Sequence, residues 1–272
     1  STVKEIGKEA FGSCQQLIGV ELCDELERID EYAFQACFSL RNVVMPPETQ
    51  ALNCFQLGCY DLMRLFGSQQ NICDAMRRRF DGLPIHRVCY YQSYQPSDVT
   101  IEQIDDILDP MPPLCPLSDV KRSNKHSITP DQLLSEQDCL GMTPLHILAC
   151  STKQNLDLYQ FIVTSNPKSL IVKDKWSCTP LLYAIRGGAS QEIIQLLIDG
   201  QKSAFPYHNL GWDRMIETLC RAGASLDNVQ RLLATHHASF ADQSIDWQKA
   251  ARELTIRFLV WREYDYYGDW RG

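Results

Sequence analysis

The sequence predicts a mostly α-helical repeat protein, α+β overall, with small strands at its N-terminal end. Three observations predict this fold class. A 23-residue repeat occupies the first 43 residues, and a second repeat of about 35 residues begins at residue 138. Self-similarity at a fixed period is typical of stacked repeat architectures. The composition, 44% apolar and 22% charged, is ordinary for a globular chain, and 272 residues suffice for about two domains.

The first repeat is a set of apolar positions that recur at one offset. It reads Ile-x3-Ala-Phe-x2-Cys-x2-Leu-x2-Val, which suits a coil whose turns cover one another. This pattern resembles the BspA-type leucine-rich repeat and implies a short solenoid fragment over residues 1–66. The matching pairs are Ile6 and Ile29, Ala10 and Ala33, Phe11 and Phe34, Cys14 and Cys37, Leu17 and Leu40, and Val20 and Val43, with a weaker third unit at Cys59, Leu62 and Leu65.

The next residues, 67–95, form a predicted helix and a closing segment. Asn71–Phe80 has apolar residues on one helical face and ends before Asp81 and Gly82. Val88–Tyr94 is aromatic and suits a short strand or a buried segment. Residues 96–137 are acidic and rich in proline, which breaks helices and sheets, so they are expected to form a linker.

The second repeat opens helices with a Thr-Pro pair. Residues Asp138–His146 recur 36 residues later as Asp174–Leu182. Threonine caps free amides, and proline in the first turn loses no hydrogen bond. A third copy aligns Arg186–Leu197 with Arg221–Leu232 at an offset of 35.

This second pattern resembles ankyrin repeats. The match to Gly-x-Thr-Pro-Leu-His is clear at Gly141–His146, weaker where Ser177 and Leu182 replace the glycine and histidine, and lost at Arg214–Ile216. The resemblance implies an ankyrin-like stack of helix pairs over residues 138–240. Residues 241–272 are then expected to supply a helix that closes the stack, since an end repeat must cover its open face.

Composition narrows the classes of function. The formal net charge of −8 argues against nucleic acid and against anionic membranes. No apolar run reaches 18 residues, so no membrane span is expected. The chain starts without Met inside a repeat, which indicates a fragment. We expect a monomer without cofactor or metal.

The twelve cysteines include no Cys-x-x-Cys pair, so zinc fingers and dithiol redox sites are disfavoured. Cys14 and Cys37 fall on repeat positions that need a small apolar residue. They are expected to be buried, reduced thiols in a cytoplasmic protein.

Two histidine sites have structural and functional interpretations. The ankyrin resemblance implies that His146 bonds backbone at the turn and joins neighbouring loops. His236 and His237, near Cys220, suggest metal, but adjacent side chains on a helix cannot both face one ion. An enzyme would need a site in residues 66–137, with a pocket lined by His86, Asp81 and Tyr90.

The leading hypothesis is a non-enzymatic scaffold or adaptor that binds a protein partner. The ankyrin resemblance implies that the turn tips and the concave face hold the partner; these tips carry Leu140, Met142, Lys175 and Trp176, beside Cys139 and Cys178. Exposed Trp, Met and Leu are typical of an interface core. Packing on the linker or on a neighbouring loop remains open, and the alternative function is a structural spacer within a larger repeat protein.

Overall fold

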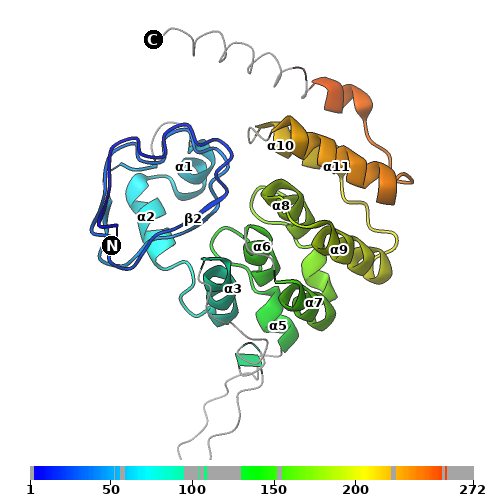
Figure 1. The fold of residues 1–272 in the computed structure, drawn as a ribbon, viewed down its shortest axis with the longest axis horizontal. Helices are drawn as coiled ribbons and strands as arrows, with labels where there is room; N and C mark the ends of the chain where they lie inside the picture. The colour runs from blue at the N-terminus through cyan, green and yellow to red at the C-terminus, as the bar shows by residue number, and fades with distance from the viewer. Residues whose placement is uncertain are drawn as a thin grey trace, which may run out of the picture.

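The computed structural model describes residues 3–51, 53–55, 59–94, 104, 107–108, 130–151, 155–221, 225–252 and 255. A flat coil of the N-terminal residues lies beside a curved stack of helices (Figure 1). Most of the expected linker and the end of the expected terminal helix lie outside the described residues.

The N-terminal coil is built from short parallel strands. Glu5 pairs with Arg28, and Gly19 with Asn42, so the 23-residue repeat is confirmed as one turn of the coil. The next turn is one residue shorter, because Arg28 pairs with Gln50. One sheet contains β1 (Glu5–Ile6), β3 (Arg28–Ile29) and β5 (Gln50–Ala51), and the other contains β2 (Gly19–Glu21) and β4 (Asn42–Val44).

A stack of three phenylalanine rings runs through the coil. Phe11 lies 5.2 Å from Phe34, and Phe34 lies 5.5 Å from Phe55, measured between ring centroids, with nearly parallel planes. Phe34 and Phe55 are fully buried. The weaker third unit therefore forms a real turn of the coil.

Cysteine thiols of the coil also connect one coil turn to the next. The Cys37 thiol donates to the Phe11 carbonyl oxygen at 3.1 Å, and the Cys59 thiol donates to that of Phe34 at 3.3 Å. Burial raises the pKa of Cys37 to about 12 and that of Cys59 to about 11, which keeps both thiols protonated. The expected burial of Cys14 is wrong: it is exposed, because no described coil turn covers it.

The third coil turn changes into helices. In α1 (Tyr60–Phe66) Leu62 is buried but Leu65 is 38% exposed, so the expected continuation of the coil pattern to Leu65 is wrong. The predicted helix that follows is confirmed as α2 (Gln69–Arg77), which Ser68 caps by accepting from the Asn71 N–H.

Residues expected to close the coil belong instead to the helical stack. Val88–Tyr94, interpreted as a strand or buried segment, is the end of α3 (Pro84–Tyr94), which packs against α6 (Pro144–Ala149). Proline at the start of α3 suits a first helical turn, and aromatic residues in the second half do not prevent a helix.

The stack consists of antiparallel helix pairs, with α6 and α8 adjacent on one side and α7 and α9 on the other (Figure 1). The Thr-Pro helix starts at α6 and α8 are confirmed, but the predicted threonine cap is wrong at Thr179, whose buried hydroxyl has no hydrogen-bond partner among the described residues. The expected linker ends before residue 130, since α5 packs on α6 and α7. The other helices are α5 (Pro130–Ser135), α7 (Leu156–Ser165), the 3-10 turn η1 (Pro167–Leu170), α8 (Pro180–Gly187), α9 (Gln191–Ala204), α10 (Trp212–Arg221), α11 (Leu226–Ser239) and residues 247–252.

Candidate functional site

The turns before α6 and α8 share one geometry. Asp138 Oδ1 accepts from the Leu140 and Met142 N–H groups at 2.9 and 2.8 Å. Asp174 Oδ1 accepts from the corresponding groups, Trp176 and Cys178, at 2.9 and 2.8 Å. Each aspartate therefore holds its turn by satisfying two backbone donors.

The second carboxylate oxygen differs between the two turns. Asp138 Oδ2 lies 2.8 Å from Arg79 Nε, and both side chains are fully buried. Asp174 Oδ2 instead accepts from the Tyr183 hydroxyl at 2.6 Å. Ile147 stands at the position that corresponds to Tyr183 and offers no donor. The first turn is thus bound to another part of the chain, and the second to its own helix.

Arg79 joins the coil to the first turn. Besides Asp138, its guanidinium donates to the carbonyl oxygens of Arg41 at 2.9 Å and Val43 at 3.0 Å. Burial alone would lower the pKa of Arg79, but the Asp138 charge and hydrogen bond outweigh it and the pKa is raised. A buried charge needs such partners.

Two histidines connect successive units in the same way. His86 Nε2 donates to the Met142 carbonyl oxygen at 2.9 Å, and His146 Nε2 donates to that of Cys178 at 3.1 Å. His146 Nδ1 accepts from the Thr143 N–H at 3.2 Å. These contacts confirm the structural interpretation of His146. Burial lowers the pKa of both histidines, that of His146 to about 4.

The equivalence of His86 and His146 reveals a unit that the repeat search missed. Leu83–His86 aligns with Thr143–His146 and shares Pro, an aliphatic residue and His. The Pro-x-His signal was present in the sequence. It was missed because it lies 60 residues before the next one, much further than the 36 residues that separate the next two units.

The first turn is not an exposed tip. Leu140 and Met142 are 0% exposed, so their predicted exposure is wrong. Arg79 Nη2 lies 3.1 Å from the Met142 sulfur, and the Leu140 carbonyl accepts from the Lys175 N–H at 3.0 Å. The neighbouring turn and the Arg79 side chain cover these residues.

The turn before α8 also contacts another part of the chain. Trp176 is half-buried, and the Arg41 guanidinium carbon lies 4.0 Å from its ring centroid. The expected free exposure of Trp176 is therefore wrong, because a cation–π contact with Arg41 covers one face of the ring, while partner binding at Trp176 stays a prediction. Lys175 and Cys139 are exposed, whereas Cys178 is buried. A partner contact at Lys175 stays a prediction.

The three residues of the enzyme alternative differ in their exposure to solvent. His86 and Tyr90 are buried, and the Tyr90 hydroxyl donates to the Val20 carbonyl at 2.9 Å. Asp81 is exposed and lies 3.9 Å from Arg87. These side chains serve packing or solvent contact instead.

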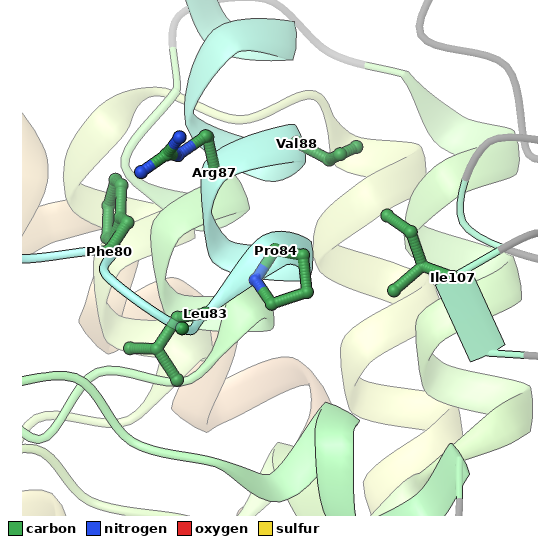
Figure 2. A pocket seen from close by; sticks show the side chains of 7 residues that line it. Phe80, Leu83, Pro84, Arg87, Val88 and Ile107 are labelled. Carbon is green, nitrogen blue, oxygen red and sulfur yellow. The ribbon is translucent and has the colours of Figure 1, made fainter. Parts of the chain in front are cut away.

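A mostly apolar pocket of about 420 Å³ lies near the start of α3 (Figure 2). Among the described residues that line it, Arg87 is charged and none is a carboxylate, a histidine or a cysteine, so these residues contain no acid–base pair. They are Phe80, Gly82, Leu83, Pro84, Arg87, Val88 and Ile107.

No group of three or more His, Cys, Asp or Glu residues in the described part of the chain is arranged to hold a metal ion. His236 Nε2 donates to the Gln243 carbonyl at 2.7 Å, while His237 is exposed. No helix among the described residues is long and apolar enough to cross a membrane.

Two exposed aromatic side chains of the described residues lie at the other end of the stack. Tyr207, in the turn before α10, is 99% exposed, and Trp247 is 57% exposed. The segment that precedes Trp247 contacts the start of α10, because the Asp246 N–H donates to Asp213 Oδ1 at 2.6 Å. We call Tyr207 and Trp247 together the α10 edge. Sequence analysis missed it because the third unit lacks the Thr-Pro motif that marks a turn.

Comparison with known proteins supports the first half of this description. Residues 1–75 match the family model described as BspA type leucine rich repeat region (6 copies). The match confirms the repeat class of the N-terminal segment but covers less than a third of the chain. No family match supports the ankyrin resemblance. Comparisons with curated proteins and with solved structures each found no match.

Proposed function

We propose that this protein is a non-enzymatic scaffold in which a BspA-type leucine-rich repeat segment is followed by an ankyrin-type stack. The aspartate-held turns, the Thr-Pro helix starts and the histidine contacts between units support the ankyrin assignment. In this assignment α3 with α5, α6 with α7, α8 with α9, and α10 with α11 are the successive helix pairs. Stacked repeats present extended surfaces that suit protein partners.

The partner surface of this proposal is the α10 edge. Contacts within the chain cover Leu140, Met142 and one face of Trp176, whereas Tyr207 and Trp247 lie open. The 99% exposure of Tyr207 carries the proposal. Aromatic anchors dominate many interfaces, and an exposed ring of this size has no role in the packing of the stack.

Site-specific photocrosslinking in cells tests the proposal. A benzophenone amino acid is placed at position 207 or, in a second variant, at position 247. We expect one protein to be captured from both positions, and Trp247→Ala should remove the adduct formed at 207. Leu156, which is 37% exposed on α7, is the matched control position. No adduct, or the same adducts from position 156, would contradict a partner at the α10 edge.

A structural spacer is the second candidate. The observation in its favour is that the turns before α6 and α8 are used within the chain. A spacer would form no specific adduct at either position of the α10 edge, so the same experiment separates the two functions.

A further inference from the structure

A second cavity lies beside the α10 edge. Its volume is about 260 Å³, and it opens between the last turn of α9, the loop before α10 and the segment after α11. Its lining is mixed, with two aromatic rings and several polar side chains. The lining residues are Gln201, Lys202, Phe205, Pro206, His208, Phe240, Asp242 and Gln243.

Gln201 is the unusual residue of this lining. It is only 1% exposed, yet neither its amide nitrogen nor its amide oxygen has a hydrogen-bond partner among the described residues. A buried amide without partners is costly, and nearly all such groups in proteins are satisfied. The side chain offers a donor and an acceptor side by side.

A second unpartnered polar atom lines the same cavity. His208 Nε2 is buried and has no hydrogen-bond partner among the described residues. Burial lowers the pKa of His208, and the charge of Lys173 acts in the same direction, which favours a neutral ring. A neutral imidazole nitrogen can donate or accept.

Gln243 and Phe240, which also line the cavity, are already committed to the fold. Gln243 Oε1 accepts from the Leu210 N–H and from Trp212 Nε1, and Gln243 Nε2 donates to the His208 carbonyl. Gln243 therefore fixes the loop and is not free for a ligand. Phe240 is 3% exposed, and Lys202 Nζ lies 5.0 Å from its ring centroid.

We propose that this cavity binds a planar carboxamide or lactam group. The group pairs its own N–H and C=O with the oxygen and nitrogen of the Gln201 amide and lies against the aromatic wall. A concave site with a few convergent polar groups beside aromatic rings is typical of ligand sites. The amide belongs either to a free small molecule or to an Asn or Gln side chain of a polypeptide. The inference does not depend on the proposed function, because a free amide fills the cavity without a partner protein.

Three probes of one shape test the hydrogen-bond pattern. Benzamide carries a donor and an acceptor, benzoate carries acceptors, and benzamidinium carries donors. Binding to the full chain is followed by calorimetry and by NMR at about 10 mM, where a ligand with a Kd of about 1 mM approaches saturation. We expect benzamide to bind best.

Variants of Gln201 assign the effect to its amide. Gln201→Leu should weaken benzamide at least about tenfold while raising the unfolding temperature, because it removes an unpaired buried amide. Gln201→Glu should turn the preference toward benzamidinium. Gln195→Leu, an exposed change on the same helix, is the control and should alter neither property.

The source of the amide is distinguished by a fourth probe, N-acetylglutamine methylamide. Tighter binding than benzamide indicates a polypeptide side chain, and weaker binding indicates a small aromatic amide. If no amide binds the unchanged protein at these concentrations, the cavity holds only solvent and the proposal is wrong. It is equally overturned if Gln201→Leu folds and binds benzamide as well as the unchanged protein does.

Discussion

At the scale of single residues, Ser177 holds a backbone conformation that residues with side chains seldom adopt. Its φ is +62°, at the position where the first turn has Gly141 with φ +77°. The left-handed region costs an ordinary L-residue about 1 kcal/mol, and glycine avoids this strain but loses more chain entropy. We predict that Ser177→Gly stabilises the protein by about 0.5 kcal/mol in urea unfolding.

The reverse change at the equivalent position is the control. A Cβ at residue 141 would lie 3.0 Å from the Lys175 backbone nitrogen, besides its unfavourable φ. Gly141→Ala should therefore cost about 1–3 kcal/mol. A stability unchanged by both substitutions would contradict the turn geometry described above.

His146 makes the stability of the stack depend on pH. Burial lowers its folded-state pKa to about 4, below the unfolded value of about 6.5. The folded protein therefore binds fewer protons than the unfolded chain between these values. The stability is complete above about pH 6.5 and falls by up to about 3 kcal/mol as the pH is lowered to about 4.

Denaturant unfolding at a series of pH values measures this effect. His146→Gln keeps a donor for the Cys178 carbonyl but cannot titrate, so its stability should change less over the same range. His237→Gln, which changes an exposed histidine, should keep the full dependence. Equal slopes for all three proteins would show that His146 is not buried as described.

At the scale of elements, the phenylalanine stack orders the coil. Phe34 contacts a ring on each side, whereas Phe11 contacts only one and is half-buried. We predict that Phe34→Ala costs about 3–5 kcal/mol, as large core truncations do. Phe11→Ala should cost less, about 2 kcal/mol or below. Thermal unfolding of the two variants measures the difference, and similar losses would contradict a continuous stack.

Elements with a short period were predictable from the sequence. The pairing of Glu5 with Arg28 follows directly from the 23-residue recurrence, and the Thr-Pro pairs mark the starts of α6 and α8. Both signals are local: the residues that define them are the residues that form the element. The candidate cavity with Gln201 had no such signal, since its walls come from three segments joined only by folding.

The errors concern contacts between distant segments. Leu140 and Met142 occupy a turn tip, where exposure is the usual expectation, yet Arg79 reaches Met142 from 63 residues away and the Lys175 N–H donates to the Leu140 carbonyl. The helix α3 was missed because its Pro-x-His start lies 60 residues before the next one. Neither the Arg79 contacts nor the start of α3 changes the local pattern of residues, so a fixed sequence period does not indicate them.

At the scale of the whole molecule, coil and stack are joined by a buried ion pair. We predict that Arg79→Met costs about 3–5 kcal/mol, because it leaves the Asp138 charge buried without its partner. The double variant Arg79→Met with Asp138→Asn should lose less than the sum of the single changes. Equilibrium unfolding of the four proteins gives the coupling energy, and additive losses would contradict a direct pair.

The buried Arg79–Asp138 ion pair also predicts that the coil and the stack unfold in one cooperative transition. Cys37 in the coil and Cys220 in α10 are both buried. Their thiols should become reactive at the same denaturant concentration in the unchanged protein, as two-state unfolding requires. Mass spectrometry after pulsed thiol labelling measures both sites. Separate midpoints would show that the coil and the stack unfold independently.

The different use of the second carboxylate oxygen has a consequence for how the repeats can be arranged. Asp138 gives this oxygen to Arg79, while Asp174 gives it to Tyr183 within its own unit. If the two units changed places, Arg79 would meet a carboxylate already engaged by a hydroxyl group. The repeats are therefore not interchangeable modules: one aspartate and the residue nine positions after it specify which unit must lie against Arg79.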